Sequence, residues 1–515
     1  MSLEKDLNKN VLYSCCNSPV WIDVINNLNQ DFNLKPSYFI GKEDSFDKIR
    51  DINSSCFFQT VKDAWKGIGF PLEKYNYPLD EDFIKQISFE ELISLKMMDR
   101  LDLDRHSFSL SQREDFFYDL LRKWIVIVKE YNIDLVISSS IPHRVFDYVL
   151  YIVCKFLNIK FVMFQMTPFS DSSFIIDDIS RTSDLLKKYI DEKTDVDDLI
   201  LRRDIEERIK RVEGHYHNAI PDYMIKQKNS LSKKVFVYQV LQNLQKVIKN
   251  PKIFFKEHES YYVQKGKMPK DSKMSKLSFY RYKFQNRIYL NNLYREYTNM
   301  CEDIDIKKIK YIFVALHYQP EETSNPTGGV FVNQKLIIEL LDTVLDKDII
   351  IIVKEHKTQF HPSFEGATSR NINFYKDLIN ISQRVKLVDI NTDPFELIDN
   401  ALATVTISGT VGWESVIRGT PSLIFGRAWY ENMVGVFKVK SKKELNQALS
   451  EITDNKYRIN IKDIYDYHKK LQHFLIEAPH YSAFEGKVER NMETNVQNLF
   501  SGLVQYLKQK GLVDE

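Results

Sequence analysis

Two glycines mark the first place where this sequence could do chemistry. The 515 residues include only 16 glycines, yet Gly409 and Gly412 lie three apart in TVTISGTVGWES (404–415). The segment passes from an apolar run into a helical pattern, and unpaired N–H groups and the dipole at a helix start favour an anion. Glycine allows close approach of the backbone, while Ser408 and Thr410 offer hydroxyl donors. The pattern predicts a phosphate site, with a serine-capped helix start as the alternative.

A histidine follows an earlier strand of the same block. His356 ends the segment VKEH (353–356), directly after the strand pattern DIIIIVKE (348–355). Because the carboxyl ends of parallel strands meet at one edge of a sheet, we expect His356 and Ser408 at the same edge. There the imidazole could donate to phosphate oxygens or to a departing phosphate. The alternative is a lone surface histidine.

A polar loop follows the first strand of this block. The loop LHYQPEETSNPTGG (316–329) places Glu321 beside Glu322. Two adjacent carboxylates suit stabilisation of an oxocarbenium-like cation, or nucleophilic attack on it. The other candidate donor- or acceptor-binding residues of the loop are His317, Gln319, Thr323 and Gly328. A solvated acidic loop is the alternative.

A second strand-to-helix junction lies in the N-terminal block. In SSSIPHRVFD (138–147), His143 and Asp147 are four residues apart, so we expect them on one face of a helix that begins near Pro142. Such a pair could act as a histidine–carboxylate base or form half of a metal site, or it could be a hydrogen-bonded pair at a helix start. No third ligand lies at a suitable spacing, so we predict no metal.

Alternating strand and helix patterns position these residues. In the C-terminal block, the predicted strands are 311–316, 348–355, 385–389, 403–408 and 421–426. Its predicted helices are 333–345, 371–381, 394–401 and 411–419. In the N-terminal block, strands are predicted at 10–16, 36–41, 133–140 and 160–165, with helices at 19–32 and 142–158. Short apolar strands separated by helices predict an α/β fold with two doubly wound, Rossmann-like parallel sheets.

Length and composition bound the protein class. A chain of 515 residues exceeds the size of a single core, so we expect several domains. They are predicted as an N-terminal domain (1–170), a helical basic insertion (171–300), a C-terminal nucleotide-sugar domain (301–455) and C-terminal helices (456–515) that pack back on the first domain. No apolar run approaches the ~18 residues of a membrane span, and the polar N-terminus does not resemble a signal peptide. Five cysteines without CxxC spacing fit a reducing compartment. A soluble, cytoplasmic protein is expected.

Charge is balanced overall but unevenly placed. The chain has 72 Lys and Arg against 71 Asp and Glu, whereas residues 226–287 alone contain 16 Lys and Arg against 3 Asp and Glu. Such asymmetry indicates an anionic partner, either nucleic acid, a membrane surface or an acidic polymer. The alternative is a solvated basic loop without a partner.

Three motifs in the same order carry a family resemblance. HYQPEETSNPTGG, VKEH and ISGTVGWES followed by GTPSLIFG, all within 311–426, resemble the capsule polysaccharide biosynthesis proteins related to bacterial Kdo transferases. More weakly, IPHRVFDYVLY within 133–166 is similar to the His-x-x-x-Asp helix of that group. The resemblance implies a GT-B fold, in which two Rossmann-like domains face each other across a cleft. It also implies a CMP-activated Kdo or nonulosonic acid, such as a sialic-, legionaminic- or pseudaminic-type sugar, as donor.

The resemblance implies roles for individual residues. His356 and the Ser408–Thr410 turn would hold the CMP phosphate, and Asp389 would reach the ribose. Glu321 and Glu322 lie where retaining members of the group place a catalytic carboxylate. Further nucleotide-binding residues are expected at Glu355, Gly409, Gly412 and Glu414. Lys357 stands where the group usually has proline, so it adds a charge and removes a conformational restraint.

The predicted function is therefore transfer of a sugar from a CMP donor to a capsular or other surface polysaccharide, or to its lipid-linked form. A monophosphate leaving group and the lack of an Asp-x-Asp motif predict transfer without metal or cofactor. His143 and Asp147 would serve the acceptor, and residues 226–287 would lie near anionic lipid on the inner face of the membrane. The alternatives are another GT-B enzyme (a polyol-phosphate transferase or nucleotide-sugar epimerase) and a non-catalytic assembly protein. Nucleic-acid binding through 279–300 is the least favoured.

Overall fold

A computed structural model of the protein divides into two compact units. It describes residues 9–192, 195–220, 257–259, 262–263, 267–453, 458–481 and 490–514. Unit 1 comprises Met1–Met98, Ser109–Asp204 and Asp466–Glu515, and unit 2 comprises Asp99–Phe108 and Ile205–Tyr465. More than half of the basic segment 226–287 lies outside the described residues.

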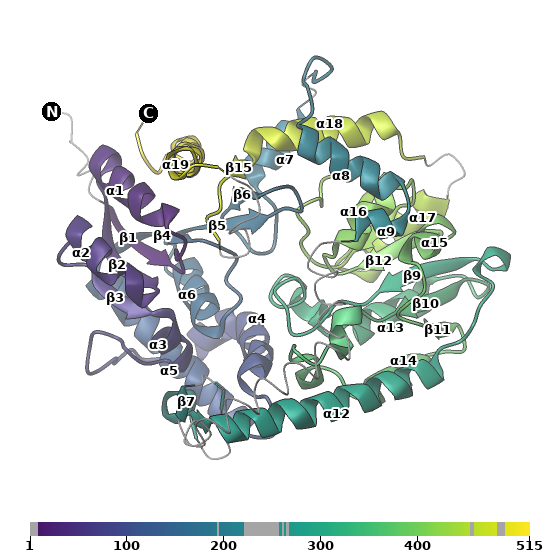
Figure 1. Ribbon diagram of the computed structural model, residues 1–515, viewed down its shortest axis with the longest axis horizontal. Coiled ribbons are helices and arrows are strands. Elements are labelled where there is room, and N and C mark those ends of the chain that lie inside the picture. Colours follow the sequence, from purple (N-terminus) through teal and green to yellow (C-terminus); the bar gives the residue numbers. More distant parts are fainter. Residues whose placement is uncertain are drawn as a thin grey trace, which may run out of the picture. The chain divides into compact units, whose positions relative to one another are not determined.

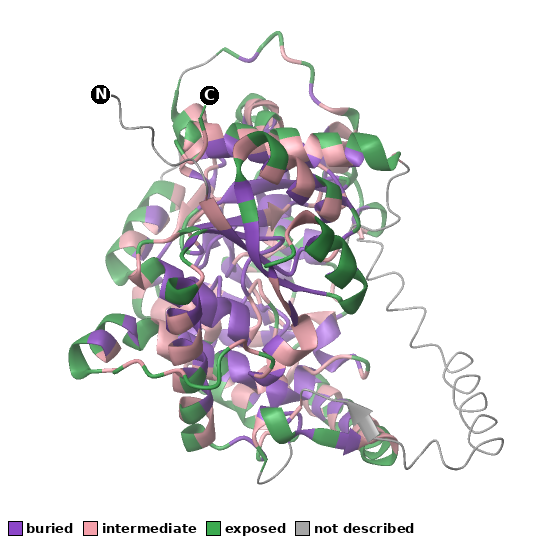
Figure 2. Ribbon diagram, turned by 90° about the vertical axis from the view of Figure 1, so that its left-hand side faces the viewer, coloured by how far each residue is buried: buried purple, intermediate pink, exposed green. Residues whose placement is uncertain are grey.

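Unit 1 is built on a seven-stranded sheet in the order β15-β6-β5-β4-β1-β2-β3. Its parallel strands are β1 (Lys9–Ser14), β2 (Leu34–Gly41), β3 (Phe57–Thr60), β4 (Ile133–Ser138) and β5 (Lys160–Met166). At one end of the sheet, β6 (Ser172–Ile176) is antiparallel to β5, and the edge strand β15 (Ile476–Glu477) is antiparallel to β6. Figure 2 shows these strands as buried between helices whose outer faces are exposed. Burial on both faces explains why the strands are continuous apolar runs.

Helices cover both faces of the unit 1 sheet. They are α1 (Val20–Phe32), α2 (Phe46–Ile52), α3 (Val61–Lys66), α4 (Glu81–Met97), α5 (Leu110–Glu130), α6 (Val145–Phe156), α7 (Asp184–Asp191) and α19 (Met492–Gln509). The C-terminal helix α19 packs against α1 (Figure 1). Leu499 and Leu503 of α19 belong to the same buried apolar cluster as Leu28 of α1. The last helix of the chain therefore completes the first α/β layer.

Unit 2 contains a six-stranded parallel sheet. Its strands are β9 (Tyr311–Ala315), β10 (Ile350–Lys354), β11 (Val385–Val388), β12 (Ala403–Thr406), β13 (Ser422–Ile424) and β14 (Val436–Lys438). Their order in the sheet is β11-β10-β9-β12-β13-β14. The strand order therefore reverses between β9 and β12. Doubly wound sheets bind ligands at the carboxyl ends of the strands at such a reversal.

The helices of unit 2 are α8 (Arg203–Glu213), α9 (Tyr216–Ala219), α12 (Lys276–Met300), α13 (Lys335–Val344), α14 (Ile372–Ile379), α15 (Pro394–Asp399), α16 (Thr410–Ile417), α17 (Lys442–Thr453) and α18 (Ile461–Leu471), of which α8 and α18 run across the division. A short hairpin pairs β7 (Glu257–Glu259) with β8 (Lys273–Ser275). Figure 1 shows α13 and α14 on one side of the sheet and α15 and α16 on the other. This arrangement is that of a Rossmann-like domain.

The α/β fold with two Rossmann-like parallel sheets is confirmed. The short strands β3, β6, β14 and β15 were not predicted, because runs of two to five residues show little periodicity. One predicted boundary is wrong: α6 begins at Val145 and not near Pro142. Arg144 is the N-cap, and its N–H donates to the Asp147 carboxylate. This hydrogen bond fixes the start of the helix at Val145. In the described part of the chain, no helix is long and apolar enough to cross a bilayer.

Candidate functional site

His317 joins the loop after β9 to the turn after β12. Its Nε2 lies 2.7 Å from Thr406 Oγ1 and accepts the N–H groups of Ile407 at 3.1 Å and Ser408 at 3.2 Å. These acceptor contacts assign the ring proton to Nδ1, which lies 3.4 Å from Thr323 Oγ1. Burial, and after it His356 and Arg370, lower the pKa of His317 to about 3. His317 is therefore neutral, and it holds the turn after β12 through these hydrogen bonds.

The glycine turn starts α16, as predicted, but the hydroxyl group of Ser408 in this turn already has a hydrogen-bond partner. Ser408 Oγ donates to the Thr323 carbonyl at 2.6 Å, so it ties the turn to the loop. Gly409 is the N-cap of α16, and a Cβ there would lie 3.0 Å from Thr406 Oγ1 and 3.2 Å from His317 Nε2. Thr410 follows as an exposed residue at the first position of the helix. The Gly412 N–H donates to the Gly409 carbonyl at 3.0 Å, so the N–H groups of Thr410 and Val411 are the anion donors that the start of this helix offers.

Gly412 supports the turn from below. A Cβ at this position would lie 2.4 Å from Tyr430 Oη and 2.7 Å from Ser422 Oγ. The space lets the Tyr430 hydroxyl donate to the Gly409 carbonyl. Gly412 is therefore needed for packing rather than for contact with an anion. Gly328 also packs closely, since a Cβ there would lie 2.6 Å from a carbonyl oxygen of its own loop.

Glu321 lies in the loop after β9 and is linked through Thr323 to His317. Thr323 Oγ1 donates to Glu321 Oε2 at 2.9 Å, which extends the hydrogen-bonded chain from His317. Glu321 exposes more than a third of its surface, yet enough protein surrounds its carboxyl group that burial raises its pKa, against Thr323 and Arg100. Glu322 contributes its main-chain carbonyl, which accepts a hydrogen bond from the Thr327 hydroxyl at 2.5 Å. The hydrogen bond from Thr323 therefore fixes the position of the Glu321 carboxylate.

His356 is a neutral hydrogen-bond donor beside this chain. Its Nδ1 accepts the Thr358 N–H at 3.2 Å, so the ring proton is assigned to Nε2. Burial, and after it Lys354 and Lys357, lower the pKa of His356 to about 4. His356 is near enough to His317 to contribute to the lowered pKa of that residue. His356 follows β10 and Ser408 follows β12, the two strands that flank β9 in the unit 2 sheet.

Lys354 is a further candidate that was not predicted from the sequence. It ends β10, in register with Ala315 of β9 and Val388 of β11. Burial, and after it Lys357, lower its pKa to about 8, against nearby carboxylates that include Asp393. Across the described residues its ammonium group has no hydrogen-bond or ion-pair partner. The letters VKEH show that a lysine ends the strand, but they do not show that its side chain is half-buried.

Glu355 and Gln319 lie behind the site rather than in it. Glu355 is buried, and its carboxylate accepts from Arg370 Nε at 2.9 Å and from the His356 N–H at 2.8 Å. Arg370 also donates to Gln319 Oε1 and, at 3.3 Å, to the His317 carbonyl. These two predicted ligand contacts are therefore positioning groups, with Arg370 as the unpredicted centre of their network.

Two further predicted residues have local structural partners. Glu414 is buried in α16 with Arg208 Nη2 4.0 Å from its Oε1. Burial raises the pKa of Glu414 to about 7, against Arg208 and Arg418. Asp389 Oδ1 accepts the Asn391 N–H at 2.7 Å and so shapes the turn after β11. Glu414 thus faces a cation of α8, while Asp389 stays at the strand end where it was expected.

His143 and Asp147 belong to unit 1 and do not share a helix. His143 precedes α6, and its Nδ1 lies 2.7 Å from the Ile141 carbonyl, to which it donates. Asp147 accepts the Arg144 N–H at 2.7 Å and lies 3.3 Å from Arg144 Nη1. Asp147 therefore forms a hydrogen bond at a helix start, as one alternative for this motif predicted, but its partner is Arg144. Throughout the described ranges, no group of three or more His, Cys, Asp and Glu side chains is placed to hold a metal ion.

Residues 219–464 match the family model described as capsule polysaccharide biosynthesis protein. The matched range contains the three motifs of 311–426 and confirms their resemblance. Unit 2 is therefore related to capsule polysaccharide biosynthesis proteins. No curated protein matches the sequence.

Similar solved structures include two enzyme classes. UDP-GlcNAc 2-epimerase from Methanocaldococcus jannaschii is 12% identical over 90% of this chain and 99% of its own, with a TM-score of 0.23. KpsC from Thermosulfurimonas dismutans, a β-Kdo 2,7 transferase, is 11% identical over 42% of this chain and 61% of its own, with a TM-score of 0.23. UDP-GlcNAc 2-epimerase from Neisseria meningitidis is 10% identical over 97% and 100%, with a TM-score of 0.21. Such low scores decide neither fold nor activity, so the fold rests on the two sheets themselves.

Proposed function

We propose that the protein is a glycosyltransferase of capsule or other surface polysaccharide synthesis, and that it binds a nucleotide-activated sugar at the carboxyl edge of the unit 2 sheet. The observation that carries this proposal is that Lys354 and His356 lie at the carboxyl end of β10 and the α16 N-terminus follows β12, the two strands that flank β9 in the parallel sheet. Each favours an anion, and perturbed pKa values cluster at functional sites. The family match of unit 2 supports the same conclusion.

The donor phosphate is assigned to this edge. The Nε2–H of His356, the ammonium of Lys354 and the first N–H groups of α16 would share its charge. These groups suit the single phosphate of a CMP-activated Kdo or nonulosonic acid. Charge balance by protein donors is consistent with transfer that does not use a metal ion.

Glu321 is the proposed catalytic carboxylate. Its position is fixed by Thr323, which is in turn anchored to His317 and to the Ser408 hydroxyl. A carboxylate held next to the phosphate edge is suited to stabilising the developing sugar cation or attacking it. We also propose, from the sequence, that His143 and Asp147 of unit 1 serve the acceptor. The same holds for a location on the cytoplasmic face of a membrane.

Ligand-dependent melting tests the donor assignment. A ligand that binds only the folded state raises the melting temperature. CMP is expected to raise it more than UDP or CDP, and a His356→Ala substitution should reduce that shift. Product analysis with CMP-, CDP- and UDP-sugars then identifies the reaction. A shift with UDP alone, together with interconversion of a UDP-sugar, would establish the epimerase alternative instead.

Excess chelator tests the absence of a metal requirement. Full activity is expected in EDTA, because the phosphate charge is met by protein groups. Activity that disappears in EDTA and returns with Mg²⁺ or Mn²⁺ would contradict this part of the proposal.

A further inference from the structure

The helix α12 has a buried face that anchors it to unit 2. Leu290, Leu293 and Tyr297 are buried in the unit 2 core, and Asn286 Nδ2 donates to the Phe364 carbonyl at 3.3 Å. The Tyr297 hydroxyl donates to the Val388 carbonyl at 2.6 Å. Figure 1 shows α12 as a long rod that runs alongside α14. The helix is therefore rigidly attached along its C-terminal half.

The N-terminal half of α12 exposes large apolar side chains. The exposed fractions are 51% for Leu277, 44% for Tyr280, 65% for Phe284 and 47% for Ile288. Their spacings of three, four and four residues place them on one stripe of the helix. Beyond Ile288, the exposed residues of α12 are polar: Asn291, Asn292, Arg295, Thr298 and Asn299. The apolar surface is thus confined to one end.

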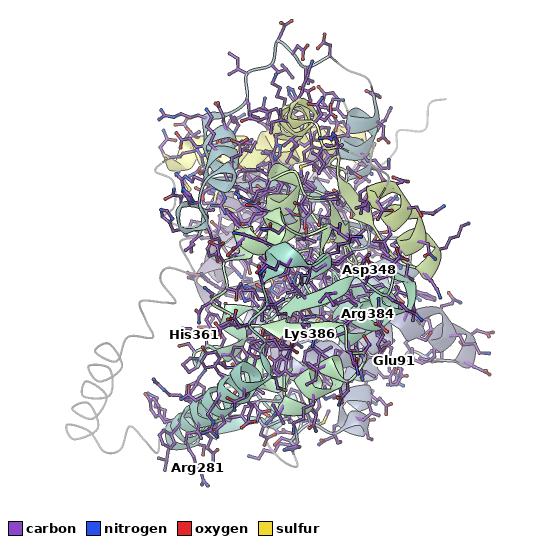
Figure 3. The ribbon with its side chains drawn as sticks, turned by 90° about the vertical axis from the view of Figure 1, so that its right-hand side faces the viewer. Glu91, Arg281, Asp348, His361, Arg384 and Lys386 are labelled. Carbon is purple, nitrogen blue, oxygen red and sulfur yellow. The ribbon has the colours of Figure 1, made fainter. Side chains whose placement is uncertain are left out.

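Basic residues accompany the apolar stripe. Lys276, Arg281, Lys283 and Arg287 lie in the same turns, and no Asp or Glu occurs in α12 before Glu296. Arg281 is exposed, and Figure 3 shows it pointing away from the ribbon. A stripe of aliphatic and aromatic groups flanked by cations is the pattern of a helix that lies in the interface of an anionic bilayer.

We propose that residues 276–288 of α12, here called the α12 docking face, bind an anionic lipid surface. Leu277, Phe284 and Ile288 would enter the headgroup and acyl boundary while Lys276 and Arg281 contact lipid phosphates. The face is about 18 Å long at 1.5 Å per residue. It would bring the enzyme to a lipid-linked acceptor, which extends the proposed function but does not depend on it.

Charge and chemistry favour lipid over other partners of this face. Tyr280 and Phe284 carry rings on which a base could stack, but Leu277 and Ile288 on the same stripe do not, so the stripe is not a continuous stacking platform for single-stranded nucleic acid. A second copy of the chain would bring its own Arg281 and Lys283 against the same cations, which repel. An anionic bilayer complements both the cations and the apolar stripe.

Vesicle co-sedimentation of the full-length protein tests the proposal. Phosphatidylcholine vesicles are compared with vesicles that also contain phosphatidylglycerol, at low and high salt. We expect binding to the anionic vesicles only, weakened by salt. Arg281→Gln should weaken it about fivefold, and a Leu277→Ser/Phe284→Ser/Ile288→Ser variant at least tenfold. The matched control Phe89→Ser/Leu92→Ser removes side chains of α4 that are 48% and 56% exposed, and should bind like the wild type.

The outcomes separate this proposal from the donor site. Loss of vesicle binding with an unchanged CMP-dependent melting shift in the triple variant would support the α12 docking face. Equal binding by the triple variant and wild type, binding that ignores lipid charge, or no binding to either vesicle would overturn it. So would wild-type self-association, measured by light scattering, or RNA binding that the triple substitution abolishes. None of these results would alter the conclusion from CMP binding.

Discussion

Lys354 should take up a proton when a nucleotide phosphate binds to unit 2. Its pKa of about 8 lies below the ordinary value of 10.5 because burial disfavours the ammonium form. A phosphate nearby favours that form and raises the pKa again. Binding is therefore linked to protonation of the lysine in the mildly alkaline range.

The expected magnitude follows from the two pKa values. At pH 8 the free protein carries about half a proton on Lys354, and a pKa raised by ~1 unit brings this to about 0.9, an uptake of ~0.4. At pH 6 the lysine is already charged, so its uptake falls to nearly zero. His356, with a pKa of about 4, takes up protons only at lower pH. CMP affinity should therefore fall as pH rises through 8 and above.

Calorimetry of CMP binding in two buffers with different ionisation enthalpies measures the uptake directly. Lys354→Met should remove the uptake at pH 8 and weaken binding. Lys354→Arg is the matched control, since an arginine stays charged and should bind with no uptake. In the ligand-free protein the lowered pKa means that the unfolded chain binds more protons between pH 8 and 10.5, so stability rises with pH there. Lys354→Met should accordingly raise the melting temperature of the free protein at pH 7.

Two results would refute this reasoning. An uptake below ~0.1 proton by the wild type at pH 8 would show that the phosphate does not lie near the lysine. An uptake that persists unchanged in Lys354→Met would assign it to another group.

Further predictions concern the turn, the carboxylate and the buried acid. Glu321→Gln should reduce turnover at least ~10²-fold while the CMP melting shift persists, and Glu322→Gln should have the smaller effect; equal effects would reject the assignment to Glu321. His317→Ala removes the acceptor of one buried and one part-buried main-chain N–H group and should cost about 2–5 kcal/mol of unfolding free energy in denaturant titrations. Gly412→Ala should displace the Tyr430 hydroxyl and weaken CMP binding, and an unchanged dissociation constant would contradict the role of that contact. The raised pKa of Glu414, about 7, means that the folded state binds more protons between pH 4.5 and 7, so stability should fall with rising pH there, and less in Glu414→Gln.

Much of the site's location was predictable from the sequence. Apolar runs of strand length between helical patterns require a parallel sheet, and parallel connections bring strand ends to one edge. The loop 316–329, His356 and the turn at Ser408 were placed together for that reason. Gly409 was also expected, because a helix start that approaches another group closely excludes a Cβ.

Only the tertiary structure decided which atoms of these residues are available. His317 pairs with residues about 90 positions away, and Ser408 with Thr323 85 positions away, so no local pattern could show that both are committed to holding the turn. Glu355 was predicted to bind the nucleotide, but its carboxylate instead accepts a hydrogen bond from Arg370. Lys354 was not predicted as a ligand, because burial, which depends on every surrounding segment, lowers its pKa while no partner for its ammonium group occurs in the described parts of the chain. Residue types and strand ends are properties of the chain, whereas hydrogen-bond partners and desolvation arise only when distant segments pack together.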